Sequence, residues 1–73
     1  MNGDFKVTPA QSAALTKMIS HPKGINASTA TGPRYAPYRT LEALVRAGLA
    51  ECIWEPLALD RYVITEQGRE VMK

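Results

Sequence analysis

Residues 37–49, with the sequence PYRTLEALVRAGL, form the stretch that decides the fold. At 100° per residue, its apolar side chains fall in a stripe of roughly 120°, the width expected of a helix packed on a small core. Glycine near its end readily takes the left-handed conformation that ends a helix. The pattern therefore predicts one short helix over residues 38–47. The residues of the stripe are Leu41, Leu44, Val45 and Gly48.

The opposite face of this helix is basic. Arg39 and Arg46 point to solvent there, with the small side chain of Ala43 between them. A guanidinium group matches both phosphate and the guanine edge of DNA, because its planar fork donates two parallel hydrogen bonds. The alternative is a solvated face on which Glu42 pairs with Arg46, an interaction of a few tenths of a kcal/mol. We favour the interpretation in which both arginines contact nucleic acid.

Local signals also set the bounds of an earlier helix. Residues 8–11 read TPAQ, in which threonine caps the helix, proline suits the first turn and glutamine closes a capping box. The helix must end near Ser20, because His21 precedes Pro22 and is pushed out of the helical region. We therefore expect a helix over residues 9–20, with His21 as a helix-end residue rather than a metal ligand. The side chains expected to be buried are Ala14, Leu15, Met18 and Ile19.

Residues 23–33 separate the two helices and have weak propensity for regular structure. A very short strand is expected at residues 24–25. Asn26 or Ser28 is then expected to cap a single helical turn through Ala30, which the Gly-Pro pair after it breaks.

The sequence period changes from helical to alternating after Leu49. Residues 50–55 alternate in polarity, which predicts a strand with one covered face. A second strand is expected over residues 61–65, and residues 56–60 connect the two as a hairpin. The side chains expected to face the core are Ala50, Cys52, Trp54, Tyr62 and Ile64.

A last helix is expected over residues 65–73. Thr65 is suited to cap it, since a threonine hydroxyl accepts a hydrogen bond from the first helical amides. Gly68 lies on the same face as Val71 and Met72. We expect Gly68 to let this helix approach the sheet or the first helix closely.

Composition limits the classes of protein that this chain can represent. A chain of 73 residues with 45% hydrophobic residues suffices for one domain with one core. Its net charge of +2 permits phosphate binding without demanding it. Cys52 is the single cysteine, which excludes an internal disulfide and a cysteine-based metal cluster.

Targeting and catalytic signals are missing from the sequence. There is no apolar run of about 18 residues and no export signal, so we expect a cytoplasmic protein without a membrane span. No nucleophile motif, paired-carboxylate motif or phosphate-cradling glycine loop is present, so we expect neither an enzyme nor a bound cofactor. Residues 1–73 are interpreted as a single domain in which residues 1–7 form a loose leader.

Two spaced motifs together resemble a known family. LxxLxxxGL at residues 41–49, followed by RYxITxxG at residues 61–68, resembles the recognition-helix-to-wing signature of winged helix-turn-helix domains in small bacterial and phage regulators. The resemblance covers about residues 38–69. It implies an α+β winged-helix fold with a three-helix core, a two-stranded β-hairpin wing and a short C-terminal helix. It further implies binding to double-stranded DNA, with the helix at residues 38–47 in the major groove and residues 56–60 as the tip of the wing.

The resemblance also implies a set of DNA contacts. The central helix contributes base or phosphate contacts, and the segment before it contributes phosphate contacts unless that segment is an ordinary exposed loop. A lone module makes few base contacts, so a homodimer is expected at a specific operator. The candidate DNA-binding residues are Arg34, Tyr35, Arg39, Thr40, Ala43 and Arg46.

The hairpin tip departs from the family pattern. Leu57 and Leu59 make it apolar, whereas a wing on phosphate usually carries Lys, Arg or Gly. These leucines either fold back over Trp54 and the open end of the core, or contact a protein partner or a second copy of the chain. The alternative function is therefore a winged-helix protein-interaction module, such as an adaptor or a phage-encoded inhibitor of host machinery.

Overall fold

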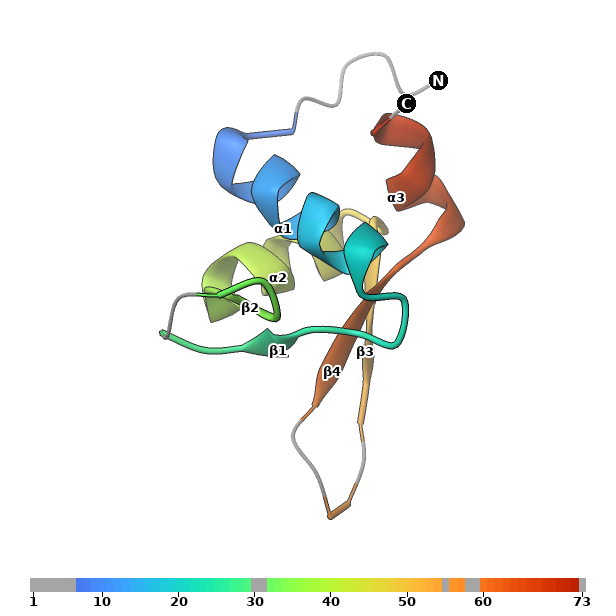
Figure 1. The fold of residues 1–73 in the computed structure, drawn as a ribbon. Helices are drawn as coiled ribbons and strands as arrows, with labels where there is room; N and C mark the ends of the chain where they lie inside the picture. Colours follow the sequence, from blue (N-terminus) through green and yellow to red (C-terminus); the bar gives the residue numbers. More distant parts are fainter. Residues whose placement is uncertain (1–6, 30–31, 55, 58–59, 73) are drawn as a thin grey trace.

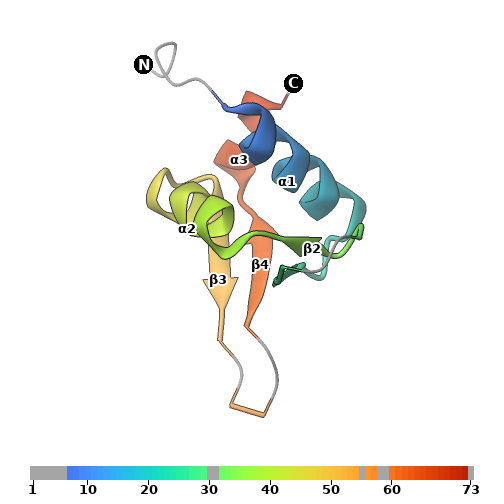
Figure 2. The ribbon, with the colours of Figure 1, turned by 90° about the vertical axis from the view of Figure 1, so that its left-hand side faces the viewer.

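The protein has an α+β fold with three helices and two small sheets (Figure 1), seen in a computed structural model that describes residues 7–29, 32–54, 56–57 and 60–72. The helices gather at one end, and the second sheet is a hairpin that projects from them (Figure 2). The molecule measures 38 × 22 × 20 Å along its principal axes. In chain order the elements are α1 (Pro9–Ser20), β1 (Asn26–Ala27), β2 (Tyr35–Ala36), α2 (Tyr38–Arg46), β3 (Ala50–Ile53), β4 (Arg61–Ile64) and α3 (Glu66–Val71).

Helix α1 has the predicted bounds and cap. The amide of Gln11 donates to Oγ1 of Thr8, and the amide of Thr8 donates back to Oε1 of Gln11, each over 3.1 Å. The helix ends at Ser20, as predicted. The prediction for Ile19 is wrong: this side chain is 39% exposed, because it lies at the edge of the stripe in the last turn. The other three predicted side chains are buried, namely Ala14, Leu15 and Met18.

Helix α2 is held by two buried leucines and a Schellman stop. Leu41 and Leu44 are fully buried, as predicted. Gly48 has φ +80°, and the amide of Leu49 donates to the carbonyl of Leu44 over 2.9 Å. The amide of Gly48 donates to the carbonyl of Val45 over 3.0 Å, which completes the motif. The helix therefore ends at a defined residue, directly before the buried Leu49.

The helical turn predicted around Asn26 and Ser28 is wrong for residues 26–29, and Ala30 lies outside the described residues. Here β1 pairs in parallel with β2. The amide of Asn26 donates to the carbonyl of Arg34, and the amide of Ser28 to that of Ala36. Because these backbone groups are satisfied by pairing across the loop, they are not available for helical bonds. In the described residues, no helix lies between α1 and α2.

The very short strand predicted at residues 24–25 is reduced to a single bridge between Ile25 and Tyr62 of the hairpin, and the strand β1 begins one residue later. The amide of Ile25 donates to the carbonyl of Tyr62 over 2.9 Å, and the amide of Tyr62 donates back over 2.8 Å. Ile25 is fully buried. This bridge fixes the start of the β1 segment alongside β4.

The β3–β4 hairpin buries its base and exposes its outer half. Ala50 and Tyr62 are 4% and 6% exposed, as predicted. The predictions for Cys52 and Trp54 are wrong: Cys52 is exposed and Trp54 is 69% exposed. Both side chains alternate correctly with Ala50, but the helices cover only the base of the hairpin, so the core ends before the strand does (Figure 1).

Helix α3 has the predicted cap and close approach. Oγ1 of Thr65 accepts from the amide of Gly68 over 3.0 Å. Gly68 is buried, and a β-carbon built there would meet the carbonyl oxygen of Leu49 and lie 2.8 Å from Cγ1 of Ile64. Glycine therefore allows α3 to pack on the start of β3. Residues 1–6 of the predicted leader lie outside the described residues, and Val7, the first described residue, packs on the core.

Candidate functional site

The basic face of α2 is open to solvent. Arg39 and Arg46 are both exposed, and the side chain of Arg46 is 80% exposed. They are seven residues apart, so at 1.5 Å rise per residue they lie about 10 Å apart along the helix axis. Ala43 and Thr40 are partly buried between them. This exposed row of side chains from Arg39 to Arg46, the α2 ridge, can therefore present two guanidinium groups without a bulky side chain between them.

A carboxylate lies beside this ridge. Oε1 of Glu42 is 4.0 Å from Nη2 of Arg46, and Oε2 accepts a hydrogen bond of 3.1 Å from the hydroxyl of Tyr38. That hydrogen bond, together with the negative charge, raises the pKa of Tyr38 above its ordinary value. The pairing of Glu42 with Arg46, which belongs to the alternative of a solvated face, is present, but an exposed pair at this distance is worth at most about 1 kcal/mol. It leaves Arg46 available for other partners.

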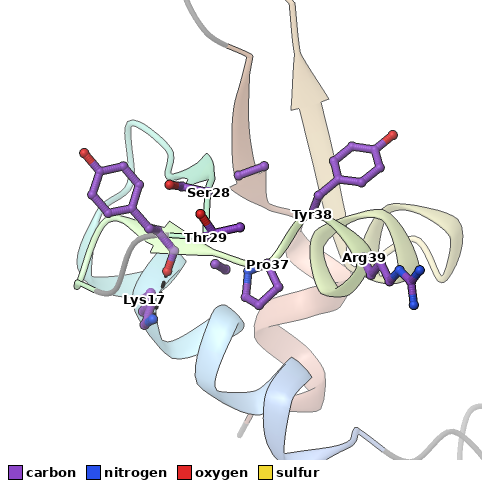
Figure 3. Close-up of a pocket in the computed structure, with 9 residues that line it drawn as sticks. Lys17, Ser28, Thr29, Pro37, Tyr38 and Arg39 are labelled. Atoms are coloured by element: carbon purple, nitrogen blue, oxygen red, sulfur yellow. Dashed lines mark hydrogen bonds between the residues drawn. The ribbon is translucent and has the colours of Figure 1, made fainter.

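A hollow of about 680 Å³ opens at the start of α2 (Figure 3). It combines aromatic, hydroxyl and cationic side chains, and Nζ of Lys17 donates to the carbonyl of Tyr35 over 2.8 Å. The side chain of Tyr38 at this hollow is 56% exposed. The lining residues are Lys17, Ala27, Ser28, Thr29, Tyr35, Ala36, Pro37, Tyr38 and Arg39.

Arg34 lies at a different hollow. Arg34 lies in the turn before β2 and lines a hollow of about 510 Å³, whereas Tyr35 and Ala36 of β2 line the hollow at α2. In the hollow at Arg34, Nη1 of Arg61 donates to the carbonyl of Lys23 over 2.6 Å. The lining residues are Ser20, His21, Pro22, Lys23, Gly24, Asn26, Arg34 and Arg61.

Three cations of these hollows were not among the predicted site residues. Lys17 lies on α1, Lys23 in the turn after it and Arg61 at the start of β4. Nothing in the sequence near them signals a shared surface, because they meet only through the pairing of β1 with β2 and of Ile25 with Tyr62.

The groove between α2 and the hairpin has the opposite charge. This hollow of about 240 Å³ includes Glu42 and Asp60, and no Lys or Arg is among its described lining residues. Burial, and secondarily the neighbouring Cys52, raise the pKa of Tyr62 to about 12. The other lining residues are Tyr38, Val45, Cys52 and Tyr62. An anionic partner is therefore disfavoured on this side of α2.

The described part of the hairpin tip is apolar and uncovered. Leu57 is 100% exposed, so the alternative in which it folds back over Trp54 is wrong. Leu59 lies outside the described residues. Leu57 and Trp54 together leave two large apolar side chains in water near the end of the hairpin.

Comparison of the chain with protein-family models, with curated proteins and with solved structures finds no match. Within residues 7–29, 32–54, 56–57 and 60–72, no cluster of three His, Cys, Asp or Glu residues could hold a metal ion. None of the described helices combines the length and apolarity needed to cross a bilayer.

Proposed function

We propose that this chain is a winged-helix DNA-binding protein, a transcriptional regulator or phage accessory factor, with α2 as its recognition helix. The observation that carries the proposal is the division of α2 into two faces. Leu41 and Leu44 anchor one face in the core, while Arg39 and Arg46 extend from the other into solvent. A rigid helix that presents exposed guanidinium groups suits entry into a major groove about 12 Å wide.

The order of the elements supports the same interpretation. Helix α1, the Ile25 bridge to β4, helix α2, the β3–β4 hairpin and α3 follow one another as in a winged-helix domain. The paired strands β1 and β2 occupy the segment between α1 and α2 for which the sequence predicted a single helical turn.

Within this proposal, phosphate neutralisation supplies most of the affinity and α2 reads the bases. Ala43 keeps the ridge low, so that the helix can approach the base edges closely. Glu42 and Asp60 disfavour a duplex in the groove beside the hairpin. Binding to a specific operator would use a homodimer, because a single helix of nine residues reads few base pairs.

The test is a titration of a labelled duplex followed by fluorescence anisotropy, between about 50 and 200 mM salt. We expect wild-type protein to lose affinity steeply with salt. Arg39→Ala and Arg46→Ala should each reduce the slope of log K against log salt by about 1. Arg69→Ala removes an exposed arginine from α3 and serves as the matched control, with an unchanged slope.

All three side chains are exposed, so circular dichroism should report an unaltered fold for each variant. Wild-type affinity that is independent of salt would reject DNA binding. Equal losses in Arg69→Ala and in the α2 variants would reject α2 as the recognition helix.

A second candidate function is a protein-interaction module. Leu57 at 100% exposed and Trp54 at 69% exposed are large apolar groups in water, as found at protein interfaces. Here Leu57→Asp should abolish binding of the protein partner, whereas Arg39→Ala should have a mild effect. The measurement is affinity purification with wild-type, Leu57→Asp and Arg39→Ala baits, followed by titration of the purified partner.

A further inference from the structure

The charged residues that line the hollows of the described structure are separated by sign. The two hollows beside the β1–β2 ribbon (Asn26–Ala27 and Tyr35–Ala36) are lined by five cationic side chains, and no Asp or Glu is among their described lining residues. The groove between α2 and the hairpin instead includes Glu42 and Asp60. The five cations are Lys17, Lys23, Arg34, Arg39 and Arg61.

The backbone of the β1–β2 ribbon is held by hydrogen bonds between its two strands and to two other elements. The amide of Asn26 donates to the carbonyl of Arg34 over 2.9 Å, which holds the two strands of the ribbon together. Nδ2 of Asn26 donates to the backbone carbonyl of Asp60 over 2.8 Å, and Nζ of Lys17 to that of Tyr35 over 2.8 Å. These contacts tie the ribbon to the hairpin and to α1, so its backbone has a defined position relative to both.

The ribbon also leads directly into α2. Arg34 precedes Arg39 by five residues, so their α-carbons are at most about 17–18 Å apart. The major groove is about 12 Å wide, and sugar-phosphate backbones border it on both sides. A duplex that meets Arg39 in the groove can therefore place its backbone across the ribbon at Arg34.

We propose that the β1–β2 ribbon, rather than the β3–β4 hairpin, is the second DNA contact of this protein. The sugar-phosphate backbone beside the groove entered by α2 lies across the ribbon, with phosphates on Lys23 and Arg34. Thr29 and the hydroxyl of Tyr35 add neutral donors of the kind that bind phosphate oxygens. The apolar, acid-flanked hairpin points away from the duplex. This inference rests on the proposed function and names the surface through which that function operates.

The test compares salt slopes for binding of one labelled duplex. The variant Lys23→Ala with Arg34→Ala removes two exposed charges and keeps the Lys23 carbonyl that Arg61 contacts. We expect its slope to fall by about 2 relative to wild type. Arg69→Ala on α3, far from the ribbon in Figure 1, and Leu57→Asp at the hairpin should both keep the wild-type slope and affinity.

The outcomes separate the inference from the proposed function. A wild-type slope in the Lys23→Ala, Arg34→Ala variant, with reduced slopes for the α2 variants, would overturn the ribbon and leave DNA binding by α2 intact. If Leu57→Asp weakens DNA binding as much as the Lys23→Ala, Arg34→Ala variant does, the duplex contacts the hairpin. That result would also overturn the inference. No binding of the duplex by the wild-type protein would overturn both.

Discussion

The backbone of Gly68 in α3 packs directly against the carbonyl oxygen of Leu49, the residue that follows the stop of α2. Leu49 also donates its amide to Leu44 and accepts the amide of Thr65 through that same carbonyl, over 2.9 and 3.1 Å. One residue therefore joins the end of the proposed recognition helix to the start of the last helix. The orientation of α2 depends on this junction.

Gly68→Ala should destabilise the protein, because its β-carbon would clash with the Leu49 carbonyl and with Ile64. Overpacking of this kind costs typically 1–3 kcal/mol, and here a backbone atom must move. Urea unfolding followed by circular dichroism measures the loss. Gln67→Ala, at the neighbouring exposed position, is the control and should change stability by less than about 0.5 kcal/mol. Equal stability of Gly68→Ala and wild type would refute the close packing.

Thr65→Ala should also destabilise the junction, by about 1–2 kcal/mol. Oγ1 of Thr65 accepts from the amide of Gly68 over 3.0 Å and donates to the carbonyl of Gly48 over 2.7 Å. Thr65→Ser keeps the hydroxyl and should recover most of the loss in the same unfolding measurement. If Thr65→Ser loses as much stability as Thr65→Ala, the methyl group of Thr65 and not its hydroxyl stabilises the junction.

Glu42→Gln should strengthen DNA binding if α2 is the recognition helix. The substitution removes a carboxylate that lies 4.0 Å from the Arg46 guanidinium on the helix meant to face phosphates. The gain should be a few-fold at low salt and shrink as salt screens the charge. Glu66→Gln, an exposed acid on α3, is the control for net charge. Equal gains in both variants would point to net charge rather than to position.

The same Glu42→Gln variant has a readout that does not need DNA. The hydrogen bond to Glu42 and its charge raise the pKa of Tyr38, so the substitution should lower that pKa toward the ordinary tyrosine value. Phenolate absorbance as a function of pH measures the change. An unaltered titration of Tyr38 would mean that Tyr38 and Glu42 are not paired in solution.

Stability should fall as the pH rises from about 10 to about 12. Burial, with a smaller effect of Cys52, raises the pKa of Tyr62 from 10.0 to about 12 in the folded protein. In this range the unfolded chain has lost the phenolic proton that the folded chain still holds, so the free energy of unfolding decreases with pH. The slope from this group is at most about 1.4 kcal/mol per pH unit.

Tyr62→Phe isolates this effect. The variant lacks the phenol, so its stability should decline less than that of wild type above pH 10, when both are measured by urea unfolding at a series of pH values. Parallel declines in the two proteins would assign the loss to other groups.

Much of the local structure followed from the sequence by itself. The bounds of α1 depend on Thr8, Gln11 and Pro22, and the stop of α2 depends on Gly48. The cap of α3 depends on Thr65. Each signal acts within about five residues, so it operates whatever the rest of the chain does. The exposure of Arg39 and Arg46 follows likewise from helical period once the opposite face is buried.

What surrounds each element was decided by the tertiary structure. Asn26 pairs with Tyr35 of β2 instead of capping a helical turn, and Tyr35 and Arg34 line different hollows. Cys52 and Trp54 have the alternation of a core strand but are exposed, and Cys52 lines the open groove between α2 and the hairpin. Burial and electrostatic surroundings are properties of neighbours brought together from distant parts of the chain, and sequence period carries no information about which neighbours those are.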